Sequence, residues 1–301
     1  MALFVNTNVS SINGQRNLTN ATNNLNTTYQ RLSSGLRINS AKDDAAGLQI
    51  SDRLTSQING LNQGNRNTND GIALAQTVEG AMDEMTTMLQ RMRTLAVQSA
   101  NGTNNTKDRD AIQQEVTQLS HEITRIACQT RFGGNSILNG TAAAGTLLGS
   151  GGVITLQVGA YNGDTLKMTG FSLGFTLSGI ADSAGIKAAN DTALVNDGTN
   201  RLAVSTQSLA AAAITMIDSF VGVIDKQRAH LGAMQNRMES TIRNQSNISM
   251  NVSDARSRIR DTDFAEESAK LSQQTIIQQA ASSMLTQANT RPQLALSLLG
   301  G

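Results

Sequence analysis

The chain has 301 residues, of which 39% are hydrophobic, so it is long enough for two domains with a sizeable core. It holds one Pro, no Trp, two Tyr and two His, and therefore has few of the aromatic and titratable groups that enzyme pockets commonly use. Its formal net charge is +1, which disfavours electrostatic attraction to nucleic acid or to an anionic membrane. We expect neither of these partners, no cofactor and no enzymatic activity.

The sequence also disfavours a membrane span, a cleavable targeting peptide and a disulfide. No apolar run approaches the roughly 18–20 residues of a membrane span, and residues 1–30 lack the apolar core of a secretory signal peptide. Residues 1–42 are acid-free and amphipathic, as in an organelle transit peptide, but only three Arg precede Lys42. Cys128 is the only cysteine, so no intramolecular disulfide can form, and a packed free thiol is the favoured interpretation.

The first segment predicts a helix with a coiled-coil seam, because its apolar and small side chains recur at alternating spacings of four and three. They are Leu18, Thr22, Leu25, Tyr29, Leu32 and Leu36. Ser40 and Asp43 then resemble a capping box that starts a second helix, which runs to about Asn101. Four glycines weaken this helix by about 1 kcal/mol each relative to Ala. They are Gly60, Gly64, Gly71 and Gly80.

Three further helices are predicted. The turn at 101–105 precedes a third helix that can fold back antiparallel onto the second. A fourth runs from about Ser205 to Arg260, and a fifth from about Thr262 to Thr290, with Pro292 as a breaker just beyond it.

Between the helical parts the hydrophobic period changes to two. Residues 154–158 alternate, Asn162-Gly163 supplies a hairpin turn, and Leu166 and Met168 continue the pattern. Residues 171–177 alternate as well, which indicates a β-containing insert. The predicted fold is therefore mainly α, a long helical rod with a terminal coiled coil and a small β-hairpin insert.

Candidate catalytic and metal sites fail on inspection. His121-Glu122 begins like a zinc-peptidase helix, but Arg125 stands where the second ligand belongs. The Gly-rich residues 145–152 match no phosphate-binding loop. The acidic pairs at 43–44 and 266–267 fit helix starts, where negative charge is favoured.

Both ends of the chain predict self-assembly. Two amphipathic helices that pair with each other still leave apolar surface, which other copies of the chain could bury in an open helical filament. The residues expected to carry this are Leu18, Leu25, Leu32, Leu36, Leu271, Ile277, Leu285, Leu298 and Leu299.

Two long stretches resemble the terminal signatures of bacterial flagellins. They are LSSGLRINSAKDDAAGLQISDRL at 32–54 and SRIRDTDFAEESAKLSQQTIIQQAASSMLTQANTRPQLALSLL at 257–299. The resemblance implies a structural subunit of the motility filament. It implies an inner-core coiled coil (1–42 and 261–301), an outer-core helical rod (43–140 and 200–260), and a hairpin with a short variable surface segment (141–199). Large outer variable domains are missing.

The resemblance further implies an extracellular location in the flagellar filament after export through the flagellar type III system. The implied partners are other flagellin subunits, the filament cap, hook-junction proteins and an export chaperone. A hook–filament junction protein and a cytoplasmic coiled-coil scaffold stay open as alternatives. A flagellin with an enzymatic insert is disfavoured, because the insert is too short and lacks metal ligands. The positions that match the family's Toll-like receptor contact are Arg91, Leu95 and Glu115, which implies a possible immune-receptor patch.

Overall fold

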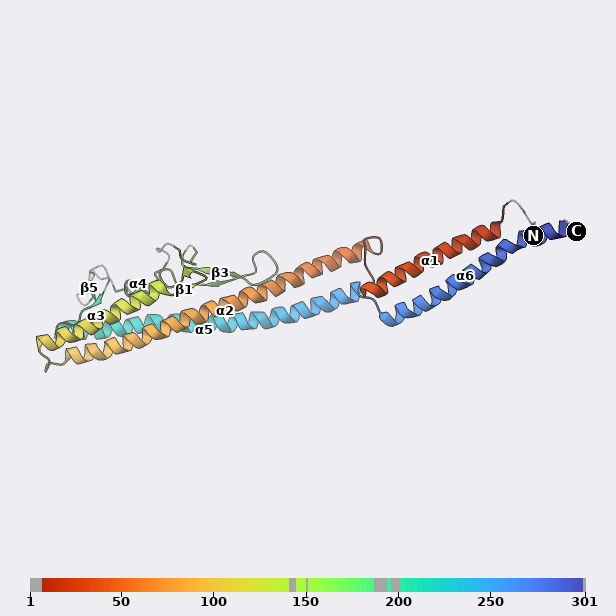
Figure 1. Cartoon of the computed structure of the whole chain (residues 1–301). Helices are drawn as coiled ribbons and strands as arrows, with labels where there is room; N and C mark the ends of the chain where they lie inside the picture. The colour runs from red at the N-terminus through yellow and green to blue at the C-terminus, as the bar shows by residue number, and fades with distance from the viewer. Residues whose placement is uncertain (1–6, 141–144, 150, 187–193, 196–200, 300–301) are drawn as a thin grey trace. The chain divides into compact units, whose positions relative to one another are not determined.

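A computed structural model describes residues 7–140, 145–149, 151–186, 194–195 and 201–299. The described elements are mainly helices, with three small two-stranded sheets (Figure 1). In chain order they are α1 (Val9–Ser34), α2 (Ala45–Ala100), α3 (Thr106–Gln129), β1 (Arg131–Phe132), β2 (Asn135–Ser136), β3 (Ile154–Gln157), β4 (Thr165–Met168), α4 (Leu177–Ser183), β5 (Leu194–Val195), β6 (Arg201–Leu202), α5 (Gln207–Arg260) and α6 (Phe264–Leu299). The mainly α fold is confirmed.

The chain divides into two compact units, and each is described by itself. Unit 1 comprises residues 1–58 and 250–301, and unit 2 comprises residues 59–249. Unit 1 therefore reaches further into α2 and α5 than the inner core expected from the sequence. The loop after α1 explains this, because the backbone N–H of Arg37 donates to the carbonyl of Arg260 at 2.7 Å.

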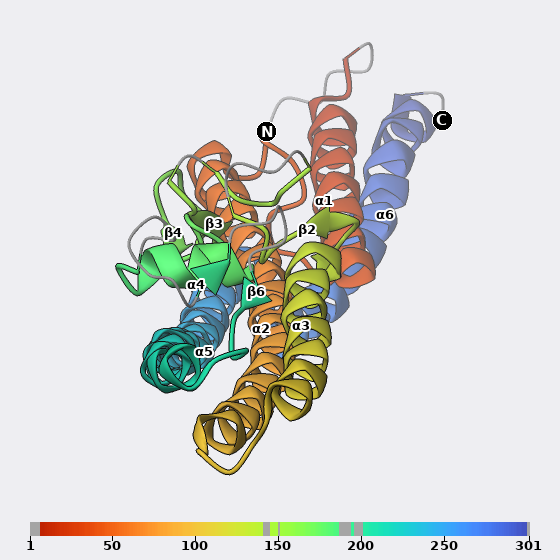
Figure 2. The ribbon, with the colours of Figure 1, turned by 90° about the vertical axis from the view of Figure 1, so that its left-hand side faces the viewer.

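Unit 1 is built on α1 and α6, which lie side by side (Figures 1 and 2). Helix α1 begins where Asn8 Oδ1 accepts a hydrogen bond from the Ser11 amide at 3.1 Å. It ends at Gly35, whose φ of 70° lies in the left-handed region that favours glycine. Asn8 contacts Ala288, near one end of α6, so the two helices run antiparallel.

The start of α2 differs from the predicted capping box. The Asp43 carboxylate accepts hydrogen bonds from the backbone and side chain of Ser40 within the preceding loop. The bond from the Ser40 backbone is the largest cause that lowers the pKa of Asp43. The first turn of α2 is capped instead by Asp44, whose Oδ1 accepts from the Gly47 amide at 2.9 Å.

Helix α6 does not stop before Pro292 as expected, because it continues to Leu299. A proline inside a helix has no N–H to donate to the carbonyl four residues earlier, which here belongs to Ala288. Asn8 Nδ2 donates to that carbonyl at 2.8 Å. A side chain from the other end of the chain thus replaces the hydrogen bond that the proline cannot make.

Unit 2 is built on α2, α3 and α5, which enclose one hydrophobic core (Figure 2). Helix α3 begins with a capping box in which Asn105 and Asp108 satisfy each other's backbone amides. Helices α2 and α5 are joined at their exposed edges by Arg93–Asp218 at 2.6 Å and by Asp83–Arg228 at 3.0 Å. The third and fourth predicted helices are therefore confirmed.

The hairpin is confirmed, with Ile154 opposite Met168 and Gln157 opposite Thr165. Its connection is longer than the two-residue turn expected at Asn162-Gly163. The hairpin packs against three glycines of α2. A Cβ at Gly60 would lie 2.7 Å from Ala160, one at Gly64 would lie 1.9 Å from Val158, and one at Gly71 would lie 2.4 Å from Leu156. Gly60 and Gly64 thus let a second backbone approach the helix, Gly71 makes room for the Leu156 side chain, and Gly80 has open space around it.

Residues 171–177 do not continue the sheet, although their sequence alternates. Phe171 and Phe175 are buried edge to face with ring centroids 6.2 Å apart, and Leu177 starts α4. Ile180 and Ala181 are buried in the same core. The expectation of a variable surface segment is therefore corrected for this stretch, since it supplies core side chains. Residues 187–193 and 196–200 lie outside the described part of the chain.

One described helix, α5, contains an 18-residue window with mean hydropathy 1.5, long and apolar enough for a membrane span. This corrects the prediction that no apolar run approaches the length of a membrane span. Such a window is weak evidence, because core helices pass the same test. Here Ile217, Phe220 and Ile224 are buried in the unit 2 core, and Asp218 within the stretch forms an ion pair. In the described residues 33% of the window is buried, and these side chains pack in the unit 2 core.

Candidate self-assembly surface

The α1 side of the α1–α6 pair alternates small and large side chains. Ala21, Leu25 and Thr28 are its buried residues, and a Cβ at Gly14 would lie 3.2 Å from Leu285. Gly14, Ala21 and Thr28 are seven residues apart, as expected for one position of a coiled-coil heptad. The predicted seam was wrong at Tyr29, which is exposed, whereas Thr22 is half-buried like Leu18.

The α6 side of the pair is unusually polar. Apart from half-buried Thr275, its half-buried or buried positions recur at spacings of four and three. They are Glu267, Leu271, Gln274, Gln278, Ala281, Leu285 and Ala288. Larger apolar side chains lie outside this seam: Ile276 is 65% exposed, Ile277 41% and Met284 67%. Two helices that pair in this way leave much of their apolar surface in water.

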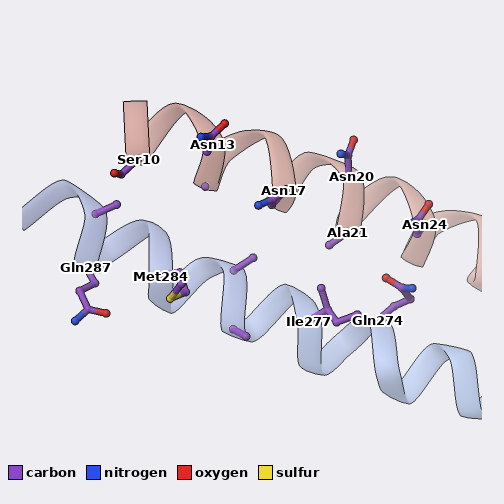
Figure 3. A pocket seen from close by; sticks show the side chains of 14 residues that line it. Ser10, Asn13, Asn17, Asn20, Ala21, Asn24, Gln274, Ile277, Met284 and Gln287 are labelled. Atoms are coloured by element: carbon purple, nitrogen blue, oxygen red, sulfur yellow. The ribbon is translucent and has the colours of Figure 1, made fainter. Parts of the chain in front are cut away.

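A groove of about 710 Å³ runs along the α1–α6 pair (Figure 3). One wall is amidic, with Asn13, Asn17, Asn20 and Asn24 at successive spacings of four, three and four on α1. The other wall is largely apolar and includes Ile277, Ala280 and Met284 of α6. At about 1.5 Å per residue, a wall from Asn13 to Asn24 is about 16 Å long, enough for three turns of another helix.

A poorly satisfied carboxylate lies at the other end of the pair. Glu267 is 3% exposed, and its Oε1 has no hydrogen-bond partner among the described residues. Arg31 is 3.8 Å away and Lys270 3.6 Å. Lys270 also bonds Glu266, which is the largest cause that raises the pKa of this lysine. The acidic pair at 266–267 is therefore split: Glu266 is at the surface, and Glu267 is enclosed.

Most of the large apolar side chains that are exposed in the described residues belong to unit 1, although unit 2 is the larger unit. In unit 1 they are Val9, Ile12, Tyr29, Ile50, Met250, Phe264, Ile276, Ile277 and Met284. Exposed apolar surface of this extent is typical of a protein–protein contact.

Comparison with known proteins decides the family. The model of the bacterial flagellin N-terminal helical region matches residues 5–143, and that of the C-terminal helical region matches residues 214–299. The chain belongs to the bacterial flagellin family. Its terminal signatures fall inside these two regions, as the resemblance predicted.

Full-length relatives agree with this flagellin assignment. The chain is 38% identical to polar flagellin F of Vibrio parahaemolyticus over 379 aligned positions, and 40% identical to flagellin D of Vibrio anguillarum over 377, with all of each chain covered. Because these alignments are longer than the 301 residues of this chain, the relatives contain segments without a counterpart here. A flagellar hook-associated protein from Vibrio parahaemolyticus shares the fold, with a TM-score of 0.54, 16% identity and coverage of 73% of this chain and 100% of the other.

The residues predicted for flagellin self-assembly fall into four groups. Leu25 is buried in the α1–α6 pair, and Ile277 is exposed in the groove wall. Half-buried positions are Leu18, Leu32, Leu36, Leu271 and Leu285. The side chains of Leu298 and Leu299 lie outside the described part of the chain. Sequence reasoning missed the asparagine wall, although its spacing of four and three was a visible signal.

The predicted immune-receptor patch is only partly a surface. Arg91 Nε donates to Glu115 Oε1 at 2.9 Å, and both side chains are about half exposed. Leu95 is 3% exposed and belongs to the hydrophobic core. Its place in the patch is therefore corrected, because a receptor could not reach this side chain in the folded unit.

The remaining chemical candidates have structural partners. Glu122 forms an ion pair with Arg125, and this bond is the largest cause that lowers the pKa of Glu122. The Cys128 thiol lies 3.4 Å from Asn139 Oδ1. Within the described ranges, no three His, Cys, Asp or Glu side chains gather as metal ligands.

Proposed function

We propose that this chain is the structural subunit of a bacterial flagellar filament and assembles with copies of itself through unit 1. Family membership supports the filament role, and flagellins are a structural protein family rather than enzymes. The single observation that carries the mechanism is the α1–α6 pair, which turns Ile276, Ile277 and Met284 away from its own seam.

The location and the remaining partners follow as finer parts of this proposal. The filament is extracellular, and the subunit reaches it through the flagellar type III route. It contacts the filament cap, the hook-junction proteins and an export chaperone. The hook–filament junction role itself is not favoured, since flagellins match the whole chain, whereas the hook-associated structure shares the fold at low identity.

Seeded polymerisation tests the assembly surface. Purified chain should extend filament fragments, as seen by electron microscopy. A double variant, Ile277→Gln with Met284→Gln, should slow extension strongly, because both side chains line the groove and neither is buried within its own chain. Tyr161→Gln, which alters an exposed side chain of the hairpin loop, is the matched control and should extend normally. If the double variant extended the seeds like wild type, the groove would not be an assembly surface.

A second function, recognition by a Toll-like receptor, is favoured by the exposed Arg91–Glu115 pair on α2 and α3. Packing between subunits would hide such a patch in filaments, so soluble monomer is the form to test. Arg91→Ala and Glu115→Gln should each reduce receptor activation, while Arg125→Ala, on another part of α3, should not. Leu95→Ala is unsuitable, because it would open a cavity in the core. Full activation by both patch variants would exclude this assignment.

A further inference from the structure

Five Asn-Gly dipeptides occur in the chain, and the structure places them in three different environments. They are Asn13-Gly14, Asn59-Gly60, Asn101-Gly102, Asn139-Gly140 and Asn162-Gly163. The first two lie within α1 and α2, the fourth is packed against another loop, and the third and fifth lie in exposed turns. Asn-Gly is the dipeptide in which cyclisation onto the next amide is least hindered, since glycine has no side chain.

We propose that Asn101 and Asn162 are sites of spontaneous deamidation, whereas Asn59 and Asn139 are protected by the fold. In this reaction the Gly amide nitrogen loses its proton to hydroxide and attacks Cγ of the preceding Asn. The new C–N bond closes a succinimide, the Cγ–Nδ2 bond breaks, and ammonia leaves with a proton from water. One water molecule then opens the ring to aspartate or isoaspartate. No oxidant or reductant is required.

The geometry around Asn101 suits this chemistry. The Thr103 amide donates to Asn101 Oδ1 at 3.3 Å, which polarises the side-chain carbonyl and folds it back over the following peptide. The Gly102 amide has no hydrogen bond within the described residues, and nothing lies within 4 Å of a Cβ built at Gly102. An amide that is exposed and unbonded loses its proton most readily, as in hydrogen exchange.

Asn162 is exposed at the tip of a loop whose base is fixed. Gln157 Nε2 donates to the Tyr161 carbonyl at 2.7 Å, and the Tyr161 amide donates to Asp164 at 3.2 Å. Nothing lies within 4 Å of a Cβ built at Gly163. The tip can therefore rearrange toward the cyclic intermediate without disturbing packed side chains.

The two protected sites differ from these turns in ways that oppose ring closure. Gly60 is inside α2, where its amide is held in the helical ladder and Ala160 lies against it. Gly140 is buried with a φ of 78°, and a Cβ there would meet the backbone of Gly174 at 3.1 Å. At either place the chain would have to open before the succinimide could form.

Ageing of the purified full-length chain in a mildly alkaline buffer tests the proposal. Peptide mapping by mass spectrometry should show conversion at Asn101 and Asn162 faster than at Asn59 and Asn139 by on the order of tenfold or more, the factor that about 1.4 kcal/mol of local opening provides. In denaturant all four sites should convert at similar rates, since their local sequences share the Asn-Gly step. Equal rates in the native protein, or faster conversion at Asn59 or Asn139, would overturn the proposal.

A variant isolates the attacking amide. Gly102→Ala fills open space, so thermal unfolding should not change, yet the added methyl group should slow conversion at Asn101 several-fold. The rate at Asn162 should stay the same in this variant and serves as the internal control. An unchanged rate at Asn101 would contradict attack by the Gly102 nitrogen.

Discussion

Gly64 of α2 is the position where the fold most clearly requires glycine. A Cβ there would lie 1.9 Å from the carbonyl oxygen of Val158 and 2.8 Å from its carbonyl carbon. Both atoms belong to the backbone of the hairpin, so no flexible side chain can move aside. The same carbonyl accepts a hydrogen bond from the buried amide of Gln245 on α5. Gly64→Ala would therefore push the hairpin away from α2 and from Gln245 together.

The magnitude follows from three contributions. Alanine gains about 1 kcal/mol of helix propensity over glycine. Overpacking against backbone costs about 1–3 kcal/mol, and a buried amide that loses its acceptor costs about 1–3 kcal/mol more. We expect Gly64→Ala to lower the free energy of unfolding of unit 2 by about 1–5 kcal/mol, or its Tm by about 2–20 °C at roughly 2–4 °C per kcal/mol.

Gly80 supplies a matched control in the same helix. Nothing lies within 4 Å of a Cβ built there, so Gly80→Ala should raise the free energy of unfolding by up to about 1 kcal/mol. Circular dichroism at helical wavelengths during thermal or urea unfolding measures both variants. If Gly64→Ala were as stable as Gly80→Ala, the close approach of the hairpin to α2 would be wrong.

Two further variants test individual contacts. Asn8→Ala should lower the temperature at which filaments dissociate, because α1 loses a cap worth about 1 kcal/mol and the carbonyl freed by Pro292 loses its donor. Asn8→Asp keeps the cap and should have the smaller effect. Equal effects would contradict the inference that Asn8 both caps α1 and donates to α6. The hydrogen bond from Arg93 is the largest cause that lowers the pKa of Asp218, so its contribution is present above the ordinary Asp pKa of about 3.9 and is lost as pH falls through the lower folded value. Asp218→Asn should flatten the loss of stability below about pH 4 in urea titrations. Asp225→Asn, whose carboxylate forms no ion pair with the described residues, should leave that slope unchanged.

Local pattern was sufficient to predict the five long helices, but not the short helix α4 at Leu177–Ser183 or which side chains meet. The prediction that Leu25 lies in the seam was correct. Leucines that are seven residues apart occupy the same heptad position, whichever neighbouring residue supplies the other seam position. The pattern could not choose between Ala21 and Thr22, which lie about 100° apart on the helix. Only the approach of α6 selects the smaller side chain, and it leaves Tyr29 in solvent.

Predictions from local sequence were wrong where a residue far away in the sequence makes the deciding contact. Pro292 was expected to end the last helix, yet Asn8 compensates for its missing donor from the opposite end of the chain. From the sequence, the glycines of α2 were expected only to destabilise the helix. In the structure the hairpin packs against Gly64. Leu95 was assigned to a surface through family resemblance, which carries no information about the burial of that side chain.

The composition of the α1–α6 pair leads to a last prediction, that this pair is disordered in the free subunit and folds on joining a filament. Ordering the 26 residues of α1 and the 36 residues of α6 costs about 1–2 kcal/mol of backbone entropy per residue. Within the pair, α1 buries only Ala21, Leu25 and Thr28, and the facing seam of α6 contains glutamines and an enclosed carboxylate. Burial between subunits has to supply the difference.

Protease should therefore trim free subunit to about residues 45–260, leave filaments intact, and produce a core that no longer polymerises. Asn13-Gly14 offers a second readout that needs no protease, since it lies inside α1. Its deamidation should be fast in free subunit and slow in filaments, because a helical amide is held in the backbone ladder only when the helix forms. Protected termini and slow conversion at Asn13 in the free subunit would mean that the pair folds alone. Its exposed apolar side chains would then be present before assembly, and a free subunit in solution should associate without seeds.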